Sequence, residues 1–156
     1  MRWRYIFNII GILTFFFGLT MMVPLFVGLY YHDQSLIPLL KSMVITVAAG
    51  LSFYFIFKSG KVEVISQREG MAIVAVGWTA VGLFGALPFY FASGFESFAD
   101  AAFESVSGFT TTGASILTNI EAVSKGILFW RSLIQWLGGM GIIVLSVAIL
   151  PFLGVG

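Results

Sequence analysis

Long apolar segments alternate with short polar connections along this chain. Four of these segments are prominent, and they cover residues 5–31, 36–57, 70–92 and 127–153. Each has about 20 residues or more, which is the length that an α-helix needs to cross the hydrocarbon core of a bilayer. The pattern therefore predicts an all-α integral membrane protein with four spanning helices.

The spacing of the segments predicts two parts. Residues 32–35 allow only a tight turn, so the first two segments should form an N-terminal two-helix transmembrane hairpin within residues 1–58. Residues 70–156 should form one repeat, in which a spanning helix, a re-entrant pore helix with its filter and a second spanning helix follow one another. Pro24 is expected to kink the first helix or to mark its outer end, because proline cannot donate the helical hydrogen bond.

A short helix signal lies between the third and fourth segments, at residues 97–107. Ser97 followed by Asp100 resembles a capping box, which marks the N-terminus of a helix. Ten or eleven residues reach about 15 Å, or half a bilayer, so this helix must dip into the membrane and return on the same side. Gly108 is expected to end the helix, since a C-terminal glycine can adopt a positive φ.

The residues after this helix, 110–113, read Thr-Thr-Thr-Gly. Irregular backbone at membrane depth persists only where protein buries it or water lines it, and there it can turn carbonyl oxygens toward a dehydrated cation. The C-terminal end of a dipping helix favours a cation as well. We therefore predict a potassium site formed by the carbonyls of Thr111, Thr112 and Gly113. Thr110 should lie at its inner edge, and Gly113 should supply the unusual backbone angles.

Other interpretations of these residues remain open. The short helix and the loop after it could instead be a buried kink, with Asp100 and Glu104 in salt bridges. Lys41, near the start of the second segment, could extend to the membrane interface or pair with a carboxylate such as Glu104. The three glycines within residues 138–141 could let the backbone approach the pore, or they could simply allow close helix packing.

Composition excludes a soluble domain and disfavours an enzyme. Hydrophobic residues make up 59% of the chain and charged residues 10%, whereas soluble domains have roughly 25% charged residues. The net charge of +1 comes without a basic run, so we expect the lipid bilayer and no nucleic acid as a partner. Serine chemistry requires a Ser–His pair, yet His32 is the only histidine and lies in a turn. We therefore predict no enzyme, with no catalytic and no cofactor-binding residues.

The bias of lysine and arginine sets the predicted orientation. Arg2 and Arg4 precede the first segment, and the connection between the second and third contains Lys58, Lys61 and Arg68. Both stretches should be cytoplasmic, which predicts a multi-pass protein with a cytoplasmic N-terminus. The filter loop then faces outward, toward the periplasm in a Gram-negative bacterium.

Two stretches resemble the Trk/Ktr/HKT superfamily of potassium transporters. Residues 103–115, Phe-Glu-Ser-Val-Ser-Gly-Phe-Thr-Thr-Thr-Gly-Ala-Ser, resemble its first pore loop. Residues 135–145, Gln-Trp-Leu-Gly-Gly-Met-Gly-Ile-Ile-Val-Leu, resemble the helix that follows that loop. The resemblance is strongest to the Trk branch and extends over the whole chain. By position, Thr111 and Thr112 match potassium-binding residues of the family, and Gly113 matches its single filter glycine.

The resemblance implies four concatenated helix–pore–helix repeats around one pore, assembled as a homodimer in the bacterial inner (plasma) membrane. It also implies inward movement of potassium (K+) and a partner, a cytosolic nucleotide-binding regulatory ring of the TrkA kind. Only one repeat is visible in the sequence, so we expect the chain to be the N-terminal part of a longer transporter. It would then contribute one quarter of a carbonyl-lined selectivity filter. The alternatives are a small homotetrameric cation channel and a non-conducting structural membrane subunit.

Overall fold

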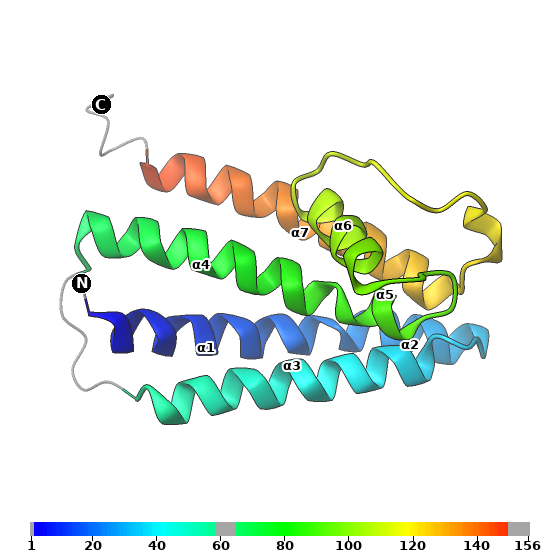
Figure 1. The fold of residues 1–156 in the computed structure, drawn as a ribbon, viewed down its shortest axis with the longest axis horizontal. Coiled ribbons are helices and arrows are strands. Elements are labelled where there is room, and N and C mark those ends of the chain that lie inside the picture. The colour runs from blue at the N-terminus through cyan, green and yellow to red at the C-terminus, as the bar shows by residue number, and fades with distance from the viewer. Residues whose placement is uncertain (1, 59–64, 150–156) are drawn as a thin grey trace.

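The computed structural model describes residues 2–58 and 65–149, with side chains through residue 143. All regular elements within these ranges are helical (Figure 1). In chain order they are α1 (Trp3–Thr20), α2 (Met22–Tyr31), α3 (Leu36–Ile56), α4 (Gln67–Gly85), α5 (Leu87–Phe91), α6 (Phe98–Phe109), the short 3₁₀ helix η1 (Ile120–Ala122) and α7 (Lys125–Ile149). The long helices run side by side along one axis, and the shorter α6 packs against α4 and α7.

Four stretches within the described residues are long and apolar enough to cross a membrane. They are Trp3–Tyr31, Leu36–Ile56, Gln67–Phe91 and Lys125–Ile143. These stretches coincide with the predicted segments, which confirms the all-α membrane fold class. The C-terminal end of the fourth predicted segment and of the predicted repeat, residues 150–156, lies outside the described residues.

Prolines interrupt two of the spans. The first span breaks at Met21, between α1 and α2, as predicted from Pro24 three residues later. Proline has no N–H to offer the carbonyl four residues before it, so the helix bends there instead of running straight. Pro88 accompanies a second break, between α4 and α5, that was not predicted. Both breaks lie in the buried core, which includes Met21 at the first break and Ala86 at the second.

Glycines bring the two helices of the hairpin into backbone contact. A Cβ added at Gly11 would lie 2.7 Å from the amide nitrogen of Tyr54, and one at Gly50 would lie 2.5 Å from that of Phe15. Such small residues let helices approach closely in a membrane, where dispersion contacts and hydrogen bonds drive association. The side-chain amide of Asn8 adds a hydrogen bond of 3.0 Å to the Tyr54 carbonyl. The predicted hairpin of α1 and α3 is thus a tightly packed unit.

An aromatic core joins the hairpin to the remainder of the chain. The Phe17 ring lies 5.5 Å, centroid to centroid, from both Phe109 and Trp130. Trp130 is fully buried, and its indole N–H donates a 3.0 Å hydrogen bond to the Gly85 carbonyl. That carbonyl lies at the break before α5, so the indole satisfies a group that would otherwise be costly to bury. The core therefore holds the C-terminal end of α6 firmly in place.

Asp33 links the turn of the hairpin to the start of α7. Its carboxylate accepts hydrogen bonds from the Gly126 N–H at 3.0 Å and the Ser35 N–H at 2.8 Å, and also from the Ser35 hydroxyl. Asp33 thus caps α7 from a position 93 residues away in sequence. Burial alone would raise the pKa of Asp33, but the hydrogen bonds from Ser35 and Gly126 outweigh it and lower that pKa below 3.8.

We expect Asp33→Ala to destabilise the full-length protein by about 1 kcal/mol at neutral pH, the usual contribution of a helix cap. Because the folded-state pKa lies below the unfolded-state value, this contribution is present above the unfolded value and disappears as the pH falls through the folded-state pKa. Thermal unfolding in detergent across acid pH will therefore show a shallower pH dependence for the variant. Glu121→Ala is the control, because it removes an exposed acid of η1, shortly before α7 in the chain. Equal acid sensitivity of D33A and the wild type would contradict the prediction.

Candidate functional site

The chain reverses direction around α6. Figure 1 shows α6 starting near the end of the bundle that holds the α2–α3 turn, and the segment after α6 returning to that end before α7 begins. The predicted capping box is confirmed, because the Ser97 side chain accepts from the Asp100 N–H at 3.2 Å and the Asp100 carboxylate accepts from the Ser97 N–H at 3.1 Å. The predicted depth of this reversal in a bilayer stays a prediction.

The prediction that Gly108 ends the helix with a positive φ was wrong. Helix α6 continues through Gly108 to Phe109, and the glycines with positive φ are Gly94 and Gly113 among the described residues. Gly108 is needed for packing instead, since a Cβ there would lie 2.7 Å from the Ile134 side chain of α7. The helix therefore ends two residues closer to the proposed ion site than the sequence indicated, at Phe109 instead of residue 107.

The loop after α6 holds two residues in left-handed backbone geometry. Gly113 has a φ of 75°, which confirms the expectation that it adopts unusual angles, and Thr111 has a φ of 57°. Positive φ is rare for a β-branched residue and costs on the order of 1–3 kcal/mol, so the surroundings must impose it. Hydrogen bonds from the Thr111 N–H to the Gly108 carbonyl (2.9 Å) and from the Thr112 N–H to the Ser107 carbonyl (3.0 Å) do so. No sequence signal pointed to Thr111, because threonine does not favour this geometry.

The four predicted ligand residues lie together at the exposed surface of the loop, but their carbonyls differ. The Thr110 carbonyl accepts the Thr111 hydroxyl at 2.7 Å, and the Gly113 carbonyl accepts a long 3.4 Å hydrogen bond from Arg131. Across residues 2–58 and 65–149, no hydrogen bond to the carbonyls of Thr111 or Thr112 is seen. Those two carbonyls have the capacity to replace water around a cation. Potassium binding at Thr110, Thr111, Thr112 and Gly113 stays a prediction.

A buried carboxylate lies behind this loop. The side chain of Glu104 is 0% exposed and forms an ion pair with the Nε of Arg131. It also accepts the Ser115 hydroxyl at 3.0 Å and the Ile116 N–H at 3.2 Å. The idea that Lys41 pairs with Glu104 is thus wrong: the cation beside Glu104 is Arg131, whereas Lys41 is exposed on α3. The alternative of a buried kink predicted salt bridges for both Asp100 and Glu104. Glu104 forms one with Arg131, whereas the Asp100 carboxylate accepts the capping-box hydrogen bond from Ser97.

Sequence reasoning missed Arg131 as a residue of the site. Its guanidinium contacts both Glu104 and the Gly113 carbonyl, although it lies 27 residues from the first and 18 from the second. The available signal was an arginine inside an apolar segment, because an unpaired charged side chain is energetically unfavourable in a membrane. Its partner was invisible because it is distant in sequence.

Glycines of α7 allow that helix to contact the loop. A Cβ at Gly138 would lie only 2.0 Å from the Phe109 carbonyl oxygen, so α7 touches the backbone where α6 ends. At Gly139 the nearest atom to such a Cβ would be the Thr111 methyl at 3.7 Å, an ordinary contact. Close packing therefore explains Gly138, and its packing partner is the backbone of Phe109, the last residue of α6.

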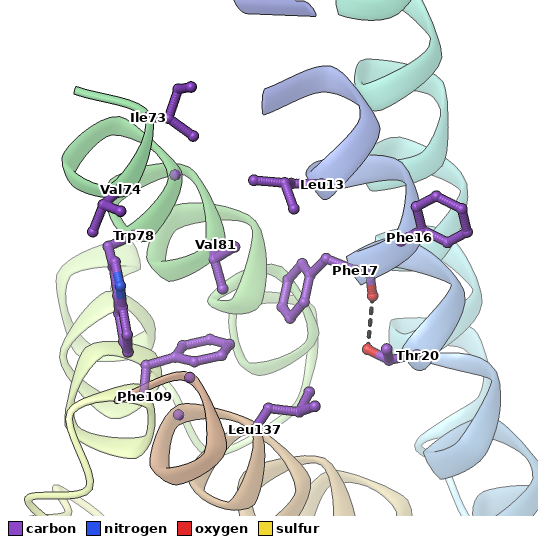
Figure 2. Close-up of a pocket in the computed structure, with 13 residues that line it drawn as sticks. Leu13, Phe16, Phe17, Thr20, Ile73, Val74, Trp78, Val81, Phe109 and Leu137 are labelled. Carbon is purple, nitrogen blue, oxygen red and sulfur yellow. Dashed lines mark hydrogen bonds between the residues drawn. The ribbon is translucent and has the colours of Figure 1, made fainter. Parts of the chain in front are cut away.

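An apolar cavity lies beside this contact. It has a volume of about 410 Å³ and is lined by uncharged residues of α1, α4 and α7 together with Phe109. Figure 2 shows the Phe109 ring between the Trp78 and Leu137 side chains, with Phe17 opposite. The lining residue Thr20 uses its hydroxyl to bond the Phe17 carbonyl at 2.7 Å. The cavity thus offers apolar walls, whereas the polar oxygens lie on the loop.

Comparison with known proteins finds one family and a set of close relatives. The family described as TrkH, a cation transport protein, matches residues 37–156. The chain is 43% identical to the Trk system potassium uptake protein TrkH of Vibrio parahaemolyticus and 44% identical to that of Escherichia coli K12. In both cases 100% of this chain aligns with 32% of the relative. The Trk system potassium uptake protein TrkG of E. coli K12 is 33% identical over 98% of this chain and 32% of its own.

A solved structure shows the same arrangement of helices. The crystal structure of the potassium transporter TrkH from V. parahaemolyticus superposes with a TM-score of 0.91 at 42% identity, covering 100% of this chain and 33% of that chain. The chain therefore spans about a third of the length of the relatives that it matches.

Proposed function

Because this chain belongs to the TrkH family of cation transport proteins, we propose that it supplies one quarter of the selectivity filter of a bacterial potassium uptake protein. The family is one of transporters and not of enzymes, and the four apolar helical stretches make the protein a multi-pass membrane protein. K+ is the transported substrate in this proposal, and it binds at the loop of residues 110–113.

One observation supports the proposal above all others. In a reversed loop between two apolar spans, Thr111 and Thr112 are exposed residues whose carbonyls accept no hydrogen bond from the described residues. Unpaired carbonyls are unfavourable in hydrocarbon, but they are suitable ligands where a dehydrated cation passes. A loop with these properties has a clear use in a pore and a clear cost elsewhere.

Three further loops of similar chemistry would complete the ring of oxygens, as the resemblance of Thr111, Thr112 and Gly113 to the family implies. The homodimeric assembly, the cytosolic TrkA-like ring and the inner-membrane location belong to the same proposal. Its orientation has the N-terminus in the cytoplasm and the loop toward the periplasm. In support of this orientation, Arg2 occupies the N-cap position of α1 and Arg68 lies in the first turn of α4. Figure 1 shows these two helix ends at the end of the bundle opposite to the α2–α3 turn.

The test is potassium uptake by the full-length protein. We expect it to restore growth in low potassium to a bacterium that lacks its own uptake systems, and to carry K+ into liposomes after purification. Absence of K+ flux, with the protein present and folded in the membrane, would contradict the proposal and favour the structural subunit. A conducting homotetramer of the 156-residue chain, measured by light scattering in detergent, would instead favour the small channel.

A further inference from the structure

Resting on the proposed function, we infer that Glu104 and Arg131 are positioning residues for the transported cation. The pair holds the loop of residues 113–116 in place and keeps the charge behind it close to zero. The potassium site predicted from the sequence consists of backbone carbonyls of residues 110–113, and neither Glu104 nor Arg131 has a role in it.

The geometry makes Glu104 the centre of the loop's support. Its two carboxylate oxygens accept from the Ser115 hydroxyl (3.0 Å each) and from the Ile116 N–H (3.2 Å) on the returning segment. Arg131 of α7 approaches the same carboxylate through Nε and reaches the Gly113 carbonyl with a second nitrogen at 3.4 Å. A single carboxylate thus ties α6, α7 and the returning segment together, and its partner Arg131 contacts the carbonyl of the proposed ligand residue Gly113.

The charges explain why a pair is needed and a lone arginine would not suffice. A guanidinium beside the Gly113 carbonyl would repel any cation held by the neighbouring carbonyls, because like charges a few ångströms apart raise the free energy of the bound state. Glu104, whose side chain is fully buried, supplies the compensating negative charge at contact distance. The loop therefore gains the hydrogen bonds of an arginine without its positive field.

A charge-balancing role for Glu104 and a purely structural role predict different effects on the KM for K+. Breaking a buried ion pair lowers stability in either case. A structural role changes the amount of folded protein and hence the maximal rate, but leaves the KM for K+ and the preference for K+ over Na+ as they were. A charge-balancing role raises the KM, because the uncompensated guanidinium weakens cation binding.

The experiment measures K+ uptake by the full-length protein in liposomes, with rates normalised to folded protein. We expect Glu104→Gln, which keeps the size and the oxygen acceptor, to raise the KM about tenfold. The double variant E104Q/R131Q removes both charges, so its KM should return toward the wild-type value. Glu121→Gln removes an exposed acid of η1, outside the loop of residues 110–116, and it should leave the KM unchanged.

A wild-type KM in E104Q, or a double variant whose KM is as high as that of the single variant, would overturn the inference while the proposed function stands. Absence of potassium transport by the wild-type protein would overturn both. Ser115→Ala tests the support of the loop separately, since it removes one donor to Glu104 and keeps the ion pair. We expect S115A to raise the KM about threefold because the returning segment is held less firmly, and an unchanged KM in S115A would overturn the claim that Glu104 positions this segment.

Discussion

Replacing Gly113 by aspartate in the full-length protein should abolish potassium uptake while the protein still inserts into the membrane. The φ of 75° at this position disfavours an L-residue, but aspartate tolerates left-handed geometry at a cost of roughly 1–2 kcal/mol. A Cβ there would meet nothing closer than the Gln135 side chain at 3.8 Å, so the fold has room for it. The new carboxylate would lie among the proposed ligands, where it would trap a cation or close the path.

Gly94 provides a matched control for this prediction. It also has a positive φ, 106°, and an added Cβ would meet no atom within 4 Å. Gly94→Asp therefore introduces the same charge away from the loop, at a φ that lies further from the left-handed region and strains the backbone at least as much. Growth in low potassium and K+ flux should be lost in G113D and kept in G94D, with both proteins present in the membrane. Normal uptake by G113D would count decisively against a potassium site at residues 110–113.

Gly138→Ala should be the most destabilising single-methyl change at the site. The added Cβ would lie 2.0 Å from the Phe109 carbonyl oxygen and 2.7 Å from its carbonyl carbon, both backbone atoms that cannot rotate away. Helix α7 must then move away from the end of α6, at a cost of about 3 kcal/mol, the upper range for overpacking a core. We expect a large loss of folded protein and of uptake, measured by thermal unfolding in detergent and by K+ flux.

The next residue shows whether this effect is specific. Gly139→Ala introduces the same methyl group into the same helix, but its nearest contact would be the Thr111 methyl at 3.7 Å. That is an ordinary van der Waals distance, so G139A should fold and transport nearly as the wild type does. Similar stability of G138A and G139A would show that α7 does not rest on the Phe109 backbone as the structure has it.

Features that depend on neighbouring residues were predictable. The four spans follow from hydropathy and length, and the break before Pro24 follows from a missing N–H. The capping box needs only Ser97 and Asp100, three residues apart, and the structure has it. The unusual angle at Gly113 was expected because glycine alone has no Cβ to oppose it. Each of these features is settled by residues that are contiguous in the chain.

Features that depend on distant residues were missed or mistaken. Gly108 was predicted to end the helix, but a glycine is needed there because the Ile134 side chain of α7 packs against it. Thr111 adopts a geometry that threonine avoids by itself, and hydrogen bonds from α6 impose it. The partner of Glu104 is Arg131 and not Lys41, a choice that needs the packing of α6 on α7.

The sequence by itself determined that this chain spans a membrane with four helical stretches, and that a short capped helix leads into a Thr/Gly loop between the last two. It did so because helix length, apolarity and capping are local properties. Tertiary structure alone decided which carbonyls of the loop stay unbonded and which buried charges support it. The physical reason is that a hydrogen bond or an ion pair depends on distance in space, and Glu104, Arg131 and Asp33 find their partners only after the helices have packed.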